Sequence, residues 1–178
     1  MSSRSVATLG VFTALVAGLG YALSSVPNVE LMSLTTFLCG ATLGVGAGAL
    51  VGGLAMAVYS SFNPYGVAPP PVFATQVMGL ALTGALGGAL ARCLHSSSRP
   101  RLGRFLVGGG VGFFVTLLYD VLTNLGTAWS MGVYRNPLPI LKAGLLFGIW
   151  HVAWNTVLFA TCLAPLLAIL HRRGKGAL

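Results

Sequence analysis

The sequence predicts an all-α polytopic membrane protein, with six transmembrane helices in one domain over residues 1–178 and both termini in the cytoplasm. Three observations support this prediction: the composition, the spacing of the apolar runs and the uneven distribution of basic residues. The chain is 56% hydrophobic and only 7% charged, whereas a soluble domain has about 25% charged residues. Because so few charged side chains cannot cover a water-facing surface, most of the chain must have lipid as its solvent.

The six helices are expected where the apolar runs lie, since a helix needs about 20 mostly apolar residues to cross a bilayer. The first run is longer than the core of a signal peptide, about 7–15 residues, so we expect a retained helix. The second run is short and is separated from the third only by Gly44 and Gly46. The last is long enough to tilt or to extend past the membrane. The predicted spans are 5–24, 29–43, 44–60, 71–91, 103–125 and 139–170.

The basic residues predict the orientation, because cytoplasmic connections of membrane proteins are enriched in Lys and Arg. With the N-terminus inside, only Arg135 and Lys142 fall on the outer side. The inner side carries the other eight: Arg4, Arg92, Arg99, Arg101, Arg104, Arg172, Arg173 and Lys175. This asymmetry predicts that both termini lie in the cytoplasm. We expect the chain to be a multi-pass protein of the plasma or inner membrane. Basic residues in such short stretches are not typical of nucleic-acid binding.

Small residues repeat at four-residue intervals on several of the predicted helices, a pattern that lets helices approach closely in lipid. Gly44, Gly48 and Gly52 on the third helix, with Gly84 and Gly88 on the fourth, are best explained by packing within the bundle. The first helix has its own ladder, which either packs inside the bundle or docks another membrane protein. This ladder consists of Gly10, Ala14, Gly18 and Ala22.

Polar and aromatic residues gather toward the predicted outer side, in or near three connections that contain Asn and Pro (24–28, 61–71 and 127–139). An ionised side chain inside a bilayer is costly and is therefore a candidate functional residue. The candidate substrate-binding residues are Asn28, Glu30, Asn63, Tyr65, Gln76, Asp120, Asn124, Trp129, Arg135, Trp150, His151 and Asn155.

The two acidic residues of the chain each allow two interpretations. Asp120 shares a helix face with Asn124, and His151 shares one with Asn155, because each pair is four residues apart. Asp120 either contacts a ligand or bonds to His151 or to a Trp indole. Glu30 either stabilises the positive end of the second helix or lies at the mouth of an outward-facing pocket. For the pair Trp150 and Trp154 we weigh an aromatic pocket wall against the ordinary preference of Trp for the membrane interface.

Motifs for enzymatic chemistry are missing from the sequence. It contains no GxxxxGK[ST] phosphate loop, HExxH or CxxC pair, and no GxSxG nucleophile elbow. We therefore expect no catalytic residue, no metal site and no cofactor, and the chain is not predicted to be an enzyme.

Several longer motifs resemble those of one transporter family. The chain is similar to the substrate-binding S components of energy-coupling factor (ECF) transporters in its length, its topology and its first-helix ladder. The segments "PNVELMSLTTFLCGATLGVGAGALVGG", "NPYGVAPPPVFATQVMGLALTGALGG" and "GIWHVAWNTVLFATCLAP" carry the resemblance over nearly the whole chain. It implies a binding subunit of an ABC-type importer that takes up a vitamin or similar micronutrient from the extracytoplasmic side.

The resemblance also implies partners and a docking site. The partners would be a transmembrane T component and two cytoplasmic ATPases, which would supply the ATP hydrolysis. In this family an Ala-xxx-Ala type motif on the first helix contacts the T component, and Gly10, Ala14, Gly18 and Ala22 match its spacing with Gly in place of some Ala. Nickel and cobalt members begin with a metal-binding His, which "MSSRS" lacks.

The substrate and two competing functions stay open. Three Trp, Tyr65 and the outer-side residues Arg135 and Lys142 would suit a planar ring with polar or anionic groups. A stand-alone, proton-coupled secondary transporter in which Asp120 titrates is the main alternative. A membrane scaffold without a ligand is the third, and it predicts that the outer polar residues can be replaced freely.

Overall fold

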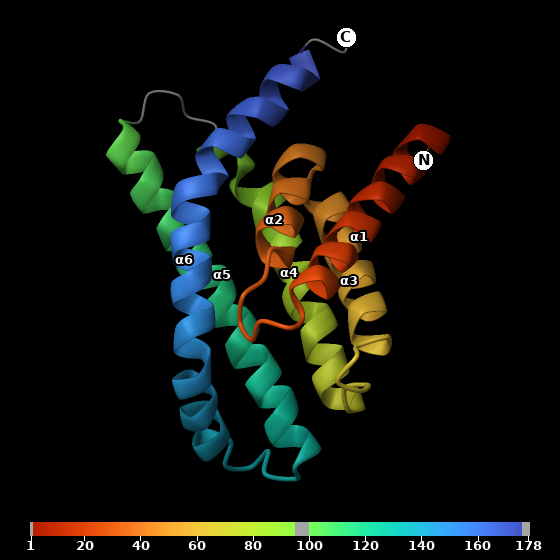
Figure 1. The fold of residues 1–178 in the computed structure, drawn as a ribbon, viewed down its shortest axis with the longest axis vertical. Coiled ribbons are helices and arrows are strands. Elements are labelled where there is room, and N and C mark those ends of the chain that lie inside the picture. Colours follow the sequence, from red (N-terminus) through yellow and green to blue (C-terminus); the bar gives the residue numbers. More distant parts are fainter. Residues whose placement is uncertain (1, 95–99, 176–178) are drawn as a thin grey trace.

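The computed structural model describes residues 2–94 and 100–175, and this part of the chain forms six helices without a strand. They are α1 (Ser3–Leu23), α2 (Met32–Leu43), α3 (Val45–Ser61), α4 (Pro70–Leu94), α5 (Arg101–Ser130) and α6 (Leu138–Lys175). The six predicted helices are therefore confirmed, with ends close to those expected. The start of α1 and the end of α6 lie at the same end of the bundle (Figure 1).

The helices differ in whether they are long enough to cross a membrane. Within the described residues, α1, α4, α5 and the Leu138–Leu170 part of α6 have the required length and hydropathy, which confirms a polytopic membrane protein. The 17 residues of α3 extend about 26 Å and the 12 of α2 only about 18 Å, against a hydrocarbon core of about 30 Å. The predicted second span also starts too early, because residues 29–31 belong to the segment that connects α1 to α2.

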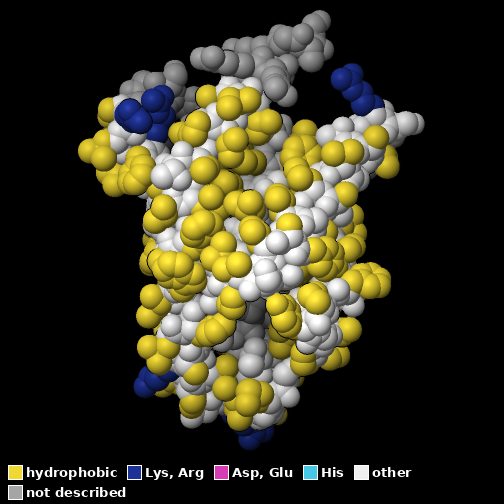
Figure 2. Space-filling view, viewed as in Figure 1, with side chains coloured by type: hydrophobic (Ala, Val, Ile, Leu, Met, Phe, Trp, Pro, Cys, Tyr) yellow, Lys and Arg dark blue, Asp and Glu magenta, His cyan; other side chains and the backbone are white. Residues whose placement is uncertain are grey.

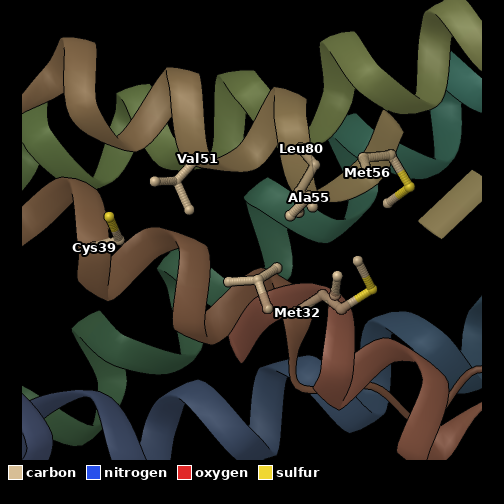
Figure 3. Close-up of a cluster of buried hydrophobic side chains, with 8 residues drawn as sticks. Met32, Cys39, Val51, Ala55, Met56 and Leu80 are labelled. Carbon is tan, nitrogen blue, oxygen red and sulfur yellow. The ribbon is translucent and has the colours of Figure 1, made fainter. Parts of the chain in front are cut away.

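The short helix α2 is the centre of the bundle. Nine of its 12 residues are buried, as expected for a helix that is hydrophobic all round. On one side Met32 and Cys39 join a cluster with α1, α3 and α4, and several of its side chains point toward one another between the helices (Figure 3). On the other side Phe37 packs edge-on against Phe159 of α6, with ring centroids 5.6 Å apart. These two contacts bury α2 from both sides.

Glycines allow α2, α3 and α4 to pack with their backbones in contact. A Cβ atom on Gly84 of α4 would overlap the carbonyl group of Gly48 on α3, and one on Gly40 of α2 would overlap the carbonyl of Gly84. No side chain fits at these positions. The predicted use of small residues for internal packing is confirmed for Gly48, Gly52, Gly84 and Gly88. Gly44 instead makes the turn between α2 and α3 with φ of 98°.

The ladder on α1 faces away from the bundle. Gly10, Ala14, Gly18 and Ala22 are all exposed, and a Cβ atom on Gly10 or Gly18 would meet nothing within 4 Å among the described residues. The opposite face of α1 makes the internal contacts, through Val16, Ala17 and Gly20. The stripe of small residues on α1 is therefore not used for packing within the described bundle.

Candidate functional site

The connection between α1 and α2, residues 24–31, folds back between the helices instead of bulging from the end of the bundle (Figure 1). Asn28 turns the chain with φ of 60°, a left-handed conformation that Asn tolerates better than most residues. Its side-chain amide donates a hydrogen bond to the carbonyl of Phe147 on α6, over 3.1 Å. At the other end of the segment, the Tyr65 hydroxyl donates to the Ser24 carbonyl over 3.0 Å. The connection is thus held from two sides.

Glu30 joins this connection to α2 and α6 through its side chain and its backbone. Its Oε2 accepts a hydrogen bond from the backbone amide of Ser33 in the first turn of α2, over 2.8 Å. Its Oε1 accepts one from the side-chain amide of Asn155, also over 2.8 Å. The indole N–H of Trp154 donates to the Glu30 carbonyl over 3.1 Å. Glu30 therefore satisfies an open amide of the α2 start and also tethers α2 to α6.

His151 lies between the two acidic side chains of the protein. Its Nδ1 is 2.8 Å from Oδ1 of Asp120, and its Nε2 is 3.6 Å from Oε1 of Glu30. Since an ionised carboxylate only accepts hydrogen bonds, Nδ1 carries the proton in the contact with Asp120. The side chains of all three residues are at most 19% exposed. The result is a buried carboxylate–imidazole–carboxylate chain that runs from α5 through α6 to the 24–31 segment.

The helix α6 makes room for the polar face of α5 with glycines. A Cβ atom on Gly148 would stand 2.8 Å from Oδ2 of Asp120, and one on Gly144 would overlap the side-chain amide of Asn124. Oδ2 of Asp120 is buried and has no hydrogen-bond partner among the described residues. The carboxylate is therefore fixed by a single side-chain bond, the one to His151.

A cavity of about 430 Å³ lies beside this chain of polar groups, a volume in the range of sites for small organic ligands. It is enclosed by the end of α1, the 24–31 segment, α3, α4, α5 and α6, in the half of the molecule away from the termini. The surface is hollowed near the middle of the face drawn in Figure 2. The apolar lining of the cavity includes Met32, Met56 and Leu80. Its polar and aromatic lining consists of Ser24, Asn28, Glu30, Ser33, Tyr59, Tyr65, Tyr119, Phe147 and His151.

Half of the predicted substrate-binding residues gather at this cavity. Asn28, Glu30, Tyr65 and His151 line it, and Asp120 and Asn155 stand behind, each hydrogen-bonded to a lining residue. For Asp120 the structure shows the bond to His151 that the sequence left as one of two interpretations. For Glu30 it shows both interpretations at once, since one carboxylate stabilises the α2 start and lines the cavity.

The remaining predicted residues do not line the cavity. Trp150 and Trp129 are 60% and 66% exposed, and Arg135 is exposed as well. Since successive helix residues point about 100° apart, the burial of His151 turns its neighbour Trp150 outward. The other three are used locally: Asn63 accepts a bond from the Tyr65 amide, Gln76 accepts one from Ser60, and Asn124 donates to the backbone of Asp120.

Some residues at the site were absent from the sequence prediction, among them Tyr59 and Tyr119, which line the cavity. A signal was present for Tyr119, which is next to Asp120 in the sequence. Of the two Trp residues considered as an aromatic wall, Trp154 and not Trp150 reaches the 24–31 segment, where it donates to the Glu30 carbonyl.

Comparisons with models of protein families, with curated proteins and with solved structures found no match for this chain. The function proposed below therefore rests on the residues of the chain itself.

Proposed function

We propose that this chain is the substrate-binding S component of an ECF-type importer, which captures a vitamin or similar micronutrient on the extracytoplasmic side of a plasma or inner membrane. The observation that carries the proposal is the cavity of about 430 Å³ beneath the 24–31 segment, away from the termini. A segment held by Asn28, Tyr65 and Trp154 is positioned to cover a small molecule. The absence of catalytic motifs in the sequence favours a binding role over an enzymatic one.

The charge distribution supports the orientation in this proposal. Among the residues with described side chains, Arg4 lies at the start of α1, Arg92 near the end of α4, and Arg101 and Arg104 at the start of α5, helix ends on the same side as the termini (Figure 1). Arg135 lies in the connection between α5 and α6, and Lys142 lies in the first turns of α6, at the opposite end. Figure 2 shows Lys and Arg side chains toward these two ends. By the positive-inside rule, the end with the termini is cytoplasmic. The cavity then opens toward the outside.

The exposed face of α1 supports the proposed partners. In lipid, helices associate through close contact of small residues, and the α1 ladder is a smooth stripe that the bundle does not use. We assign this stripe to a transmembrane T component, which carries two cytoplasmic ATPases that hydrolyse ATP. The chain itself supplies the binding site.

Purification from native membranes tests this function. Tagged wild-type chain should bring down one further polytopic membrane protein and two ATPases, and mass spectrometry of the washed protein should find a retained small molecule. An Ala14→Leu variant should lose these partners and keep ligand binding, because Ala14 is on the exposed stripe. Ala89→Leu is the matched control, since it is the same substitution at an exposed alanine of α4, away from the stripe. A wild-type chain that purifies without ATPases under conditions that preserve membrane complexes would contradict the proposal.

The buried Asp120–His151–Glu30 chain favours a second candidate, a stand-alone proton-coupled transporter. Titratable groups inside a membrane bundle are typical of proton relays. This candidate predicts uptake into liposomes by the purified chain alone, driven by a pH gradient and abolished by Asp120→Asn. The importer subunit predicts no such uptake without its partners.

A further inference from the structure

We propose that the ligand of the cavity is a small organic cation built on a flat ring, such as a heteroaromatic ring with a quaternary or protonated nitrogen. This inference rests on the proposed function as a binding subunit and adds the chemical class of the substrate. Its first support is the absence of Lys and Arg from the described residues that line the cavity. On the face in Figure 2, basic side chains appear only at the two ends of the molecule. An anionic ligand would meet no Lys or Arg side chain in the described lining of the cavity.

The second support is the net charge beside the cavity. Two carboxylates and one imidazole, those of Glu30, Asp120 and His151, sum to −2 with a neutral ring and to −1 with a protonated one. Both oxygens of Glu30 accept N–H hydrogen bonds, as suits the ionised, acceptor-only form. A net charge within the membrane region is costly unless a partner compensates it. A ligand cation is such a partner.

The third support is the carboxylate that faces the cavity. Glu30 lines the cavity, and its Oε1 lies 3.6 Å from Nε2 of His151. His151 is only 8% exposed, and its Nδ1 is engaged by Asp120. One imidazole therefore serves two carboxylates. A ligand with N–H donors next to a positive charge would find a further acceptor in Glu30.

The aromatic lining selects the shape of the cation. Tyr59, Tyr65 and Tyr119 all line the cavity, and the face of a Tyr ring attracts a cation within about 6 Å. Met32 and Met56 complete the wall, and their flexible thioethers pack well against flat rings. A flat, positively charged ring uses both the aromatic faces and the carboxylate.

This inference replaces the expectation of anionic groups that the sequence raised. That expectation relied on Arg135 and Lys142. Arg135 is exposed in the connection between α5 and α6, and Lys142 lines a separate groove between these two helices. Neither residue reaches the cavity.

The test is a binding series in which only the charge of the ligand varies. The purified chain in detergent would be titrated with benzamidinium, benzamide and benzoate, and with 1-methylnicotinamide, nicotinamide and nicotinate, while its intrinsic fluorescence and thermal unfolding are followed. In at least one ring system the cation should bind at least tenfold more tightly than its neutral partner, and the anion should bind least. Equal or tighter binding of the neutral or anionic members, or no binding of either cation at millimolar concentration, would overturn the proposal.

Two variants link the charge preference to the cavity. Glu30→Gln should reduce cation affinity about tenfold or more, as for a lost charge-assisted contact, and should reduce the affinity of the neutral members less, so that the preference for the cation shrinks. If Glu30→Gln does not fold, the variants Tyr59→Phe and Tyr59→Leu test whether the cation contacts the Tyr59 ring, because Phe keeps the ring face and Leu removes it. Cation affinity should survive in Tyr59→Phe and fall in Tyr59→Leu. An equal effect of the two would contradict the ring contact.

The outcome is separable from that of the proposed function. Selective cation binding without co-purifying ATPases would support the ligand class and remove the importer assignment. Co-purification with ATPases, combined with a retained anionic ligand, would do the reverse.

Discussion

Replacing Gly84 by alanine should separate α3 from α4 and destabilise the bundle. The added Cβ would overlap the carbonyl of Gly48 and stand 3.0 Å from its Cα, so the neighbour is backbone and no side chain can turn aside. The helices must then move apart by about 1 Å, a gap that forfeits roughly a quarter to a half of each van der Waals well. This small change therefore acts on the whole seam.

The magnitude follows from the number of contacts that one such seam holds. With about 50 heavy-atom contacts of about 0.15 kcal/mol each, the seam holds about 7–8 kcal/mol, and losing a quarter to a half of it costs about 2–4 kcal/mol. The better helix propensity of Ala returns at most about 1 kcal/mol, which leaves a net loss of about 1–3 kcal/mol. For a chain of this length each kcal/mol shifts the unfolding midpoint by about 2–4 °C. The midpoint in detergent should therefore fall by about 2–12 °C.

Two glycines of the same protein are matched controls for this measurement. A Cβ on Gly53, in the same α3–α4 seam, would make an ordinary contact of 3.7 Å with Ala81, and one on Gly18 of α1 would meet nothing within 4 Å. Gly53→Ala and Gly18→Ala should therefore melt at or above the wild-type temperature. A Gly84→Ala protein as stable as these two would refute the backbone contact between α3 and α4, and with it the placement of α2.

Three further predictions concern the site and the orientation. Trp154→Phe removes the indole donor to the carbonyl of Glu30. Ligand affinity should therefore fall about fivefold, which corresponds to the loss of one hydrogen bond of about 1 kcal/mol. Unchanged affinity and unchanged proteolysis of the 24–31 segment would show that this tether is dispensable. Asn28→Val places a β-branched residue at φ of 60°, which it tolerates poorly, so the variant should bind ligand more weakly than Asn28→Gly; the reverse order would contradict the turn. In a background without the other native thiols, a Val67→Cys thiol should react with a membrane-impermeant maleimide added outside intact cells. The native Cys93 thiol should react with it only after the membrane is opened. Labelling of both thiols from outside would contradict the proposed orientation.

The elements of this fold were predictable from sequence because lipid imposes a simple rule on each helix. Apolar runs of about 20 residues predict spans, and the ends of α1, α3 and α4 fall within three residues of those expected. Tertiary packing explains the late start of α2. α5 continues to Ser130, and α2 starts three residues late because Glu30 is held by Asn155 and Trp154, which are more than a hundred residues away.

The site was predictable in its chemistry and not in its shape. Acidic and imidazole side chains are rare in a bilayer, so their presence alone indicated Glu30, Asp120 and His151, and all three lie together. Which aromatic residues surround them depends on how the helices are rotated, and local pattern does not determine this. Trp150 and Trp154 are alike in sequence, yet one is 60% exposed and the other donates to Glu30. Arg135 belongs to a connection whose path the sequence leaves undetermined.

The shortness of α2 has a consequence for the distance a bound molecule would travel. Even with its Gly44 end at one membrane surface, a helix of about 18 Å begins about 12 Å below the other surface of a hydrocarbon core of about 30 Å. Glu30, two residues before α2, therefore lies at a depth where an ordinary interhelical loop could not satisfy its backbone. In the proposed importer, a ligand at Glu30 has crossed roughly the first third of the apolar barrier. The ATP-driven part of that proposed transport cycle then has the remaining two thirds to cover.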